Sequence, residues 1–151
     1  MPDVFISYSS KDEDLAKFVK KHLTNEGLSV FLASTSLKPG DHWSKKIMEN
    51  LRLSNWVILL ASRAACQSQF VQQELGGAIY GNKKIIPVVW DMSLSELPGW
   101  TRDYQAINLE GTTMESLSQK MADIAKDIKA EKNKGLLILG AIFLALLVFR
   151  K

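Results

Sequence analysis

The segment Trp56–Ala61 is an uninterrupted apolar run. Such a run is typical of a central parallel strand, because helices cover both faces of a parallel sheet and leave neither side of the strand in water. Other strands are predicted at residues 3–8, 28–32, 84–90 and 106–109. Amphipathic stretches lie between them, and this alternation predicts an open parallel α/β sheet of five strands.

Start and stop signals place helices between these strands. Ser10 followed three residues later by Glu13 has the pattern of a capping box, and Gly27 stands where a glycine commonly ends a helix. Further helices are predicted from Asp41, from Ser68 to about Tyr80, and over residues 113–132.

The composition changes sharply near the C-terminus. Residues 135–149 contain no polar side chain and have basic residues on both sides. As a helix they would measure about 22 Å, short of a hydrocarbon core of roughly 30 Å, but snorkelling basic side chains and a thinner bilayer can close that gap. We therefore expect a domain over residues 1–131 and a single-pass membrane anchor over residues 132–151. A core helix or an oligomerisation helix is the alternative.

Composition excludes several classes of function. The net charge of +3 is too small to indicate a nucleic-acid partner. The single Cys66 excludes an intrachain disulfide and a multi-cysteine zinc site, and it indicates a reducing compartment. Neither Gly-rich phosphate motif, GxGxxG or GxxxxGK, occurs. His22 and His42 lie too far apart in sequence to suggest a metal site; His22 has a structural or solvated role, and His42 is a weak candidate for ligand contact.

Ligands of open parallel sheets bind beyond the carboxyl ends of the strands. The predicted loops at that edge are residues 8–12, 33–42, 62–68 and 91–103.

Glu74 is the main candidate for chemistry. On the helix that begins at Ser68, it lies beside the apolar stripe that contains Val71 and Leu75. A glutamate at that border is partly desolvated, which raises its pKa and suits it to a pocket; a solvated surface glutamate is the alternative. The neighbouring Gly76-Gly77 pair, costly in a helix interior, predicts that another part of the molecule or a ligand approaches this helix closely.

Five blocks of sequence follow one another along the chain: Val4–Tyr8 with Lys11 and Asp12; Gly27–Leu32 with Leu37–Gly40; Trp43 with Ile47 and Val57–Ser62; Gln69–Val71 with Glu74 and Leu75; and Ile85–Val89, including Pro87. In this order, over about residues 3–130, they resemble the blocks of the TIR (Toll/interleukin-1 receptor) domain. The resemblance implies a flavodoxin-like fold with helices on both faces of the sheet. Members of this family either scaffold immune signalling or cleave NAD.

The resemblance also implies a site. In the NAD-cleaving members, the glutamate that matches Glu74 is catalytic, and NAD is the substrate, with no metal or cofactor. Where many of these enzymes carry acidic residues after the second strand, this chain has Ala33, Ser34 and Thr35. Residues expected to contact the substrate or to wall its pocket are Tyr8, Ser9, Ser10, Phe5, Thr35 and Trp43.

From these features we expect an NAD glycohydrolase that acts in immune defence or cell-death signalling and releases ADP-ribose or a cyclic isomer. The family's active site is commonly completed by a second TIR domain, so self-association at the membrane is the expected switch. The expected location is a membrane, with the TIR domain in the cytoplasm, because no signal peptide is visible and NAD is there. The alternative is a membrane-tethered adaptor without catalysis. A segment that perturbs the bilayer ranks last.

Overall fold

The computed structural model describes residues 1–33 and 43–148, apart from the side chains of Trp43, Ser44, Trp100 and residues 138–148. Its strands form a parallel sheet in the order β2-β1-β3-β4-β5. This is the strand order of flavodoxin-like doubly wound folds, so the predicted fold class is confirmed. The strands are β1 (Val4–Ser7), β2 (Val30–Leu32), β3 (Trp56–Ala61), β4 (Lys84–Val89) and β5 (Ile107–Asn108).

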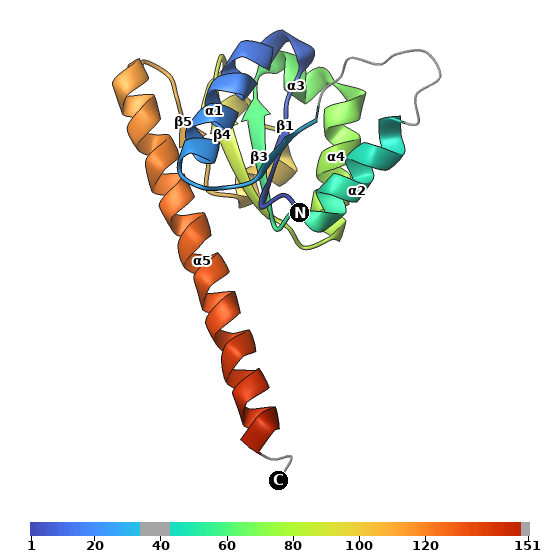
Figure 1. Ribbon diagram of the computed structural model, residues 1–151. Coiled ribbons are helices and arrows are strands. Elements are labelled where there is room, and N and C mark those ends of the chain that lie inside the picture. The colour runs from blue at the N-terminus through green and yellow to red at the C-terminus, as the bar shows by residue number, and fades with distance from the viewer. Residues whose placement is uncertain (34–42, 149–151) are drawn as a thin grey trace.

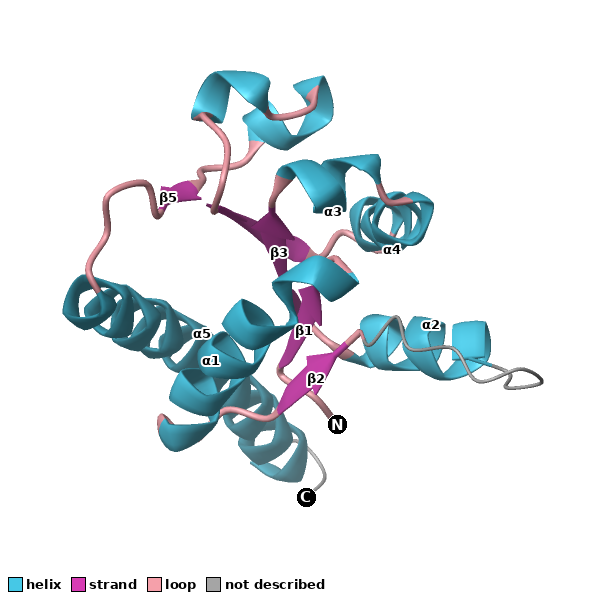
Figure 2. Cartoon of the chain, turned by 90° about the horizontal axis from the view of Figure 1, so that it is seen from above, coloured by secondary structure: helices cyan, strands magenta, loops and turns pink. Residues whose placement is uncertain are grey.

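Helices cover both faces of the sheet (Figures 1 and 2). Successive residues of a strand point to opposite faces, and β3 feeds both cores in this way. Ile58 and Leu60 pack with α1 and α5, whereas Val57 and Leu59 pack with α2, α3 and α4. Burial on both sides explains why β3 is apolar throughout. The helices are α1 (Glu13–Asn25), α2 (Trp43–Leu53), α3 (Arg63–Gln67), α4 (Gln69–Tyr80) and α5 (Met114–Val148).

The predicted capping box of Ser10 and Glu13 is wrong. Ser10 instead begins a short 3₁₀ helix, η1 (Ser10–Asp12), and α1 starts only at Glu13. The cap of η1 is Ser9, whose hydroxyl accepts a hydrogen bond from the Lys11 N–H at 3.3 Å. The helical turn therefore begins one residue earlier than the pattern indicated, because a different serine captures the first free amide.

Two other boundaries are informative. Gly27 follows α1 with φ +89°, which confirms the predicted glycine stop. By contrast, α3 occupies residues predicted as a loop. Ser62 and Ser68 cap α3 and α4, each by accepting a hydrogen bond from a backbone N–H three residues on. The α3 helix has only five residues, too few for an apolar periodicity to identify it in the sequence.

Pro87 lies inside β4 without disrupting the sheet. Lys84 N–H donates to Asn55 C=O at 3.0 Å and Trp90 N–H donates to Ala61 C=O at 3.2 Å, so the even-numbered amides of β4 face β3. The nitrogen of Pro87 therefore faces the β5 side. Pairing with β5 begins only at Val88, and the proline leaves no ladder bond unmade.

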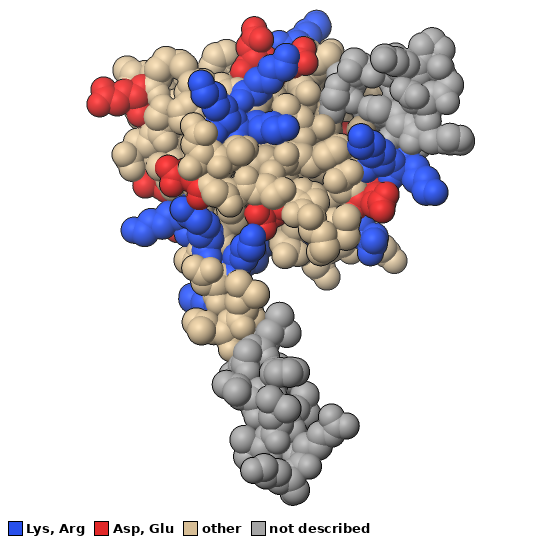
Figure 3. Space-filling view, in the orientation of Figure 1, with Lys and Arg blue, Asp and Glu red and all other residues tan. Residues whose placement is uncertain are grey.

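The predicted amphipathic helix and the apolar segment after it form one continuous helix. The first part of α5 is buried through Leu117, Met121 and Ile128, and its last part projects away from the domain (Figure 1). On the face that Figure 3 shows, basic side chains lie where the helix leaves the domain, with acidic side chains close by. Within residues 1–33 and 43–148, no helix is both long and apolar enough to cross a membrane. The anchor over residues 132–151 stays a prediction.

Candidate functional site

The carboxyl ends of β1 and β3 carry most of the buried polar side chains. We call this region, with η1, α3 and the loop after β4, the carboxyl edge. It lies at the upper end of the sheet in Figure 1 and nearest the viewer in Figure 2. Five side chains there are polar and buried: Ser7, Ser9, Asp12, Ser62 and Glu74.

Glu74 points from α4 toward the end of β1. It is only 4% exposed, and its Oε2 accepts a hydrogen bond from the Ser7 hydroxyl at 2.5 Å. Burial raises the pKa of Glu74 to about 7, and the Ser7 hydrogen bond opposes part of that rise. The predicted burial at the border of the apolar stripe is confirmed. A carboxyl group with this pKa is populated in both charge states near neutral pH.

A second acid–serine pair joins η1 to α3. The Ser62 hydroxyl donates to Asp12 Oδ2 at 2.5 Å and accepts from the Ala65 N–H at 3.0 Å. Burial is also the largest influence on Asp12, and it raises the pKa of this carboxyl. Sequence reasoning placed Lys11 and Asp12 in the first loop but did not foresee this pair. The only signal for it was a serine that directly follows an apolar strand.

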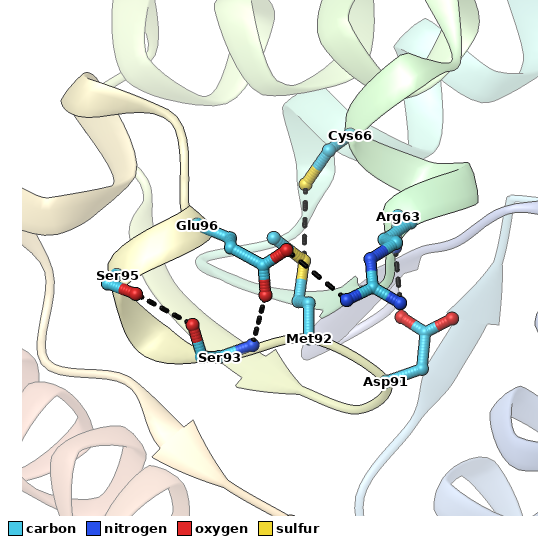
Figure 4. A network of polar contacts seen from close by, with 7 residues as sticks. All are labelled: Arg63, Cys66, Asp91, Met92, Ser93, Ser95 and Glu96. Atoms are coloured by element: carbon cyan, nitrogen blue, oxygen red, sulfur yellow. Dashed lines mark hydrogen bonds and ion pairs between the residues drawn. The ribbon is translucent and has the colours of Figure 1, made fainter.

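The loop after β4 is tied to α3 (Figure 4). The Arg63 N–H donates to Asp91 Oδ1 at 2.9 Å, and the Arg63 guanidinium donates to Glu96 Oε1 at 3.2 Å. On the same side, the Cys66 thiol lies 3.9 Å from Met92 Sδ. These contacts hold the loops of β3 and β4 together at the carboxyl edge.

The structure brings some of the predicted site residues together. Tyr8 and Ser9 are buried directly after β1, next in the chain to Ser7, whereas Ser10 is exposed. Phe5 is fully buried and stacks on Phe31 with ring centroids 5.5 Å apart, so the structure gives it a packing role; its contact with a ligand stays a prediction.

Three predicted residues cannot be placed against the site. Thr35 and His42 belong to residues 34–42, which lie outside the described part of the chain. Trp43 begins α2, but its side chain is not among those described. Their contacts with a ligand stay predictions.

The remaining sequence-based expectations concern packing. His22 has the predicted structural role, because its Nδ1 lies 2.9 Å from the Phe18 carbonyl and its Nε2 lies 3.1 Å from the Ser118 hydroxyl. The close approach predicted at the glycine pair is found at Gly77. A Cβ there would lie 3.1 Å from a Leu51 side-chain atom of α2.

Comparisons with known proteins agree with this fold. The family model described as TIR domain matches residues 4–124. NAD(+) hydrolase SARM1 of Danio rerio is 32% identical over 159 residues, covering 88% of this chain and 22% of that protein. The probable 2′ cyclic ADP-D-ribose synthase TcpO of Methanobrevibacter olleyae is 25% identical over 135 residues, covering 87% of this chain and 40% of that protein.

Among solved structures, the TIR domain of the Toll-related receptor TRR-2 from Hydra magnipapillata superimposes with a TM-score of 0.69 at 19% identity, covering 85% of this chain and 99% of that one. The chain spans less than half the length of the two curated relatives, 22% and 40%. Because the family model covers most of the described domain, the chain belongs to the TIR domain family.

Proposed function

We propose that this TIR domain cleaves the bond between nicotinamide and ribose in NAD. The observation that carries the proposal is Glu74, a buried carboxyl group held by Ser7 at the carboxyl edge. Ligands of this sheet architecture bind at that edge. Relatives named as an NAD(+) hydrolase and a probable cyclic ADP-D-ribose synthase support NAD as the substrate.

A single carboxylate suits this reaction. When the C1′–N bond breaks, its electron pair goes to the nicotinamide ring, which changes from cationic to neutral and needs no general acid. The ribose becomes oxocarbenium-like, and ionised Glu74 stabilises it by charge and by a hydrogen bond to a ribose hydroxyl. Water then adds to C1′ and releases a proton, giving ADP-ribose. Capture of C1′ by a hydroxyl of the same molecule gives a cyclic isomer instead.

Ser7 is the positioning residue in this scheme. Its hydroxyl donates to one carboxylate oxygen of Glu74, and this hydrogen bond favours the ionised form that the transition state requires. In this proposal the other carboxylate oxygen meets the ribose. Tyr8, Ser9 and Ser10, which follow Ser7 in the chain, are the proposed contacts to the rest of the dinucleotide.

Self-association is the proposed switch, and the membrane is the proposed place. The α5 helix leaves the domain at the end opposite the carboxyl edge and carries the apolar segment with it (Figure 1). Attaching many copies to one bilayer raises their effective concentration and favours contacts between domains. Depletion of NAD on a trigger would serve immune defence or cell-death signalling.

The test is nicotinamide release from NAD by the full chain, purified in detergent and then reconstituted densely on liposomes. Glu74→Gln keeps an acceptor for the Ser7 hydroxyl but removes the charge, so we expect activity to fall at least about 10²-fold. Glu110→Gln, on an exposed turn, makes the same chemical change away from the site and should leave turnover unaltered.

Chromatography of the products separates ADP-ribose from its cyclic isomers. Turnover that survives in Glu74→Gln would refute the assigned role of this residue. No turnover in dispersed or dense samples, with the domain folded, would favour the adaptor.

A further inference from the structure

A hollow opens at the end of the domain opposite Glu74. We call it the basal cleft; it has a volume of about 430 Å³ and lies between the turn after α4 and the middle of α5. Its lining includes Asn55, Trp56 and Asn82, the three lysines Lys83, Lys84 and Lys132, and the two acidic residues Asp3 and Glu131. At the α5 end, the lining continues onto Gly135 and Leu136.

Positive charge is in excess at this cleft. Lys84 and Lys132 are paired with the carboxylates of Glu131 and Asp3. Lys83 instead donates to the backbone carbonyl of Arg52 at 2.6 Å. Among the described residues, no carboxylate lies within ion-pair distance of Lys83 or Arg52. Burial, and then the charge of Arg52, lower the pKa of Lys83, as expected of a cation without a bound anion.

The surroundings of the cleft are those of a membrane interface. Leu136 and Leu137 are 60% and 74% exposed, and the sequence continues without a polar side chain to residue 149. Tyr80, directly before the cleft, is 93% exposed. Exposed aromatic and basic side chains beside an apolar helix are typical of the bilayer–water boundary. Figure 3 shows basic side chains around the base of the domain, where α5 leaves it.

We propose that the basal cleft binds the phosphate of an anionic phospholipid headgroup, with Lys83 in the lining and Arg52 beside Lys83 as its cationic partners. The proposal rests on the membrane attachment put forward above and adds the lipid class and the orientation. The strands begin at this end, so the domain stands on the bilayer with its carboxyl edge pointing away (Figure 1). Glu74 then faces the solvent and other copies, and not the lipid.

A lipid fits this cleft better than a free anion does. The polar wall, with its lysines and asparagines, ends at Leu136, so a bound molecule should have a polar head and an apolar tail in that order. Free phosphate would use only the polar wall. Each basic side chain near an anionic surface contributes about fivefold to affinity.

The test is native mass spectrometry of the full chain released from neutral detergent micelles. Phosphatidylglycerol and phosphatidylcholine with identical acyl chains are titrated separately, and glycerol phosphate serves as the headgroup without a tail. We expect phosphatidylglycerol to bind at least about tenfold more tightly than either. The double variant Arg52→Gln, Lys83→Gln should weaken it about 25-fold. Lys17→Gln, on the exposed side of α1, should leave it unchanged.

Any one of three results would overturn the proposal: equal binding of the two lipids, a loss of phosphatidylglycerol binding in Lys17→Gln equal to that in the double variant, or binding of glycerol phosphate as tight as that of phosphatidylglycerol. If the double variant fails to fold, hydrogen exchange of the unaltered chain tests the proposal instead. In phosphatidylglycerol nanodiscs, hydrogen exchange should slow at residues 81–84 and not in α3, relative to phosphatidylcholine nanodiscs; the same exchange in both would refute it.

This result is separable from the catalytic proposal. Glu74→Gln should bind phosphatidylglycerol like the unaltered chain, because Glu74 lies at the opposite end of the sheet. Lipid binding without turnover would leave the basal cleft established and the NAD proposal refuted. NAD cleavage without a preference for phosphatidylglycerol would refute the lipid proposal and leave the NAD proposal standing.

Discussion

At the carboxyl edge, Glu74 and Asp12 are buried and each is hydrogen-bonded to a serine, whereas at the base of the domain Glu131 forms an ion pair with Lys84 while both side chains stay about half exposed. Burial without a cation raises the pKa of a carboxyl group. An exposed ion pair keeps both groups charged and contributes little to stability. The first arrangement suits a carboxyl group that meets the charge developing on a substrate away from water, and the second suits a surface that exchanges partners with a ligand.

The largest effect on stability should come from the protonation of Glu74. Its pKa is raised from the usual 4.5 to about 7, so between these values the folded protein holds a proton that the unfolded chain has released. The contribution of Glu74 to stability is complete below about pH 4.5 and is lost as the pH rises through about 7. This loss amounts to about 3 kcal/mol.

The measurement is urea unfolding of the unaltered chain and of Glu74→Gln, each from about pH 4.5 to about pH 8. The difference in unfolding free energy between the two should move in favour of the variant as the pH rises. A difference that stays constant would mean that Glu74 is ionised in the folded protein throughout, and the contrast between the two ends of the sheet would not hold.

A smaller effect should follow from breaking the Asp12–Ser62 pair. Ser62→Ala removes the cap of α3 and also leaves Asp12 without its donor, which together should cost about 2 kcal/mol. Ser68→Ala is the matched control, because Ser68 caps α4 and has no carboxylate partner among the contacts of the described residues; its loss should cost about 1 kcal/mol. Urea unfolding measures the loss of unfolding free energy in both variants. Equal costs would show that the buried pair adds nothing beyond the cap.

The glycine pair in α4 tests how closely α4 packs against α2. A Cβ at Gly76 meets nothing within 4 Å, so Gly76→Ala should stabilise the domain by about 1 kcal/mol. At Gly77, a Cβ would lie 3.1 Å from Leu51 and 3.2 Å from Met48, and the crowding should cancel most of that gain. Thermal unfolding compares the two variants. An equal gain in stability in both variants would show that the side chains of Leu51 and Met48 move aside at Gly77 without a cost in free energy.

The architecture was largely readable from the sequence. The apolar run of β3 and the amphipathic stretches between strands predicted the parallel sheet and its two helical layers. What the sequence did not reveal was local: a cap can form at either of two adjacent serines, Ser9 or Ser10, and the five residues of α3 are too few to show a helical period.

For the site, the helical stripe on α4 predicted that Glu74 is desolvated, because spacing within one helix determines which residues share a face. The hydrogen bond to Ser7 joins residues 67 positions apart, and the one between Asp12 and Ser62 joins residues 50 apart. No pattern within a single element specifies such pairs. They follow from the order of the strands in the sheet.

The smallest effect should come from the base of the domain. Glu131→Gln removes the ion pair with Lys84, whose side chain is 53% exposed, and we expect the unfolding free energy to change by less than about 0.5 kcal/mol. Lys84 also lies over the Trp56 ring, 5.1 Å from its centroid, and this contact remains in the variant. Urea unfolding beside Ser62→Ala measures both ends under one condition. A loss of unfolding free energy in Glu131→Gln equal to that in Ser62→Ala would mean that the ion pair between Glu131 and Lys84 is structural. A ligand would then have to overcome that free energy to displace the Glu131 carboxylate.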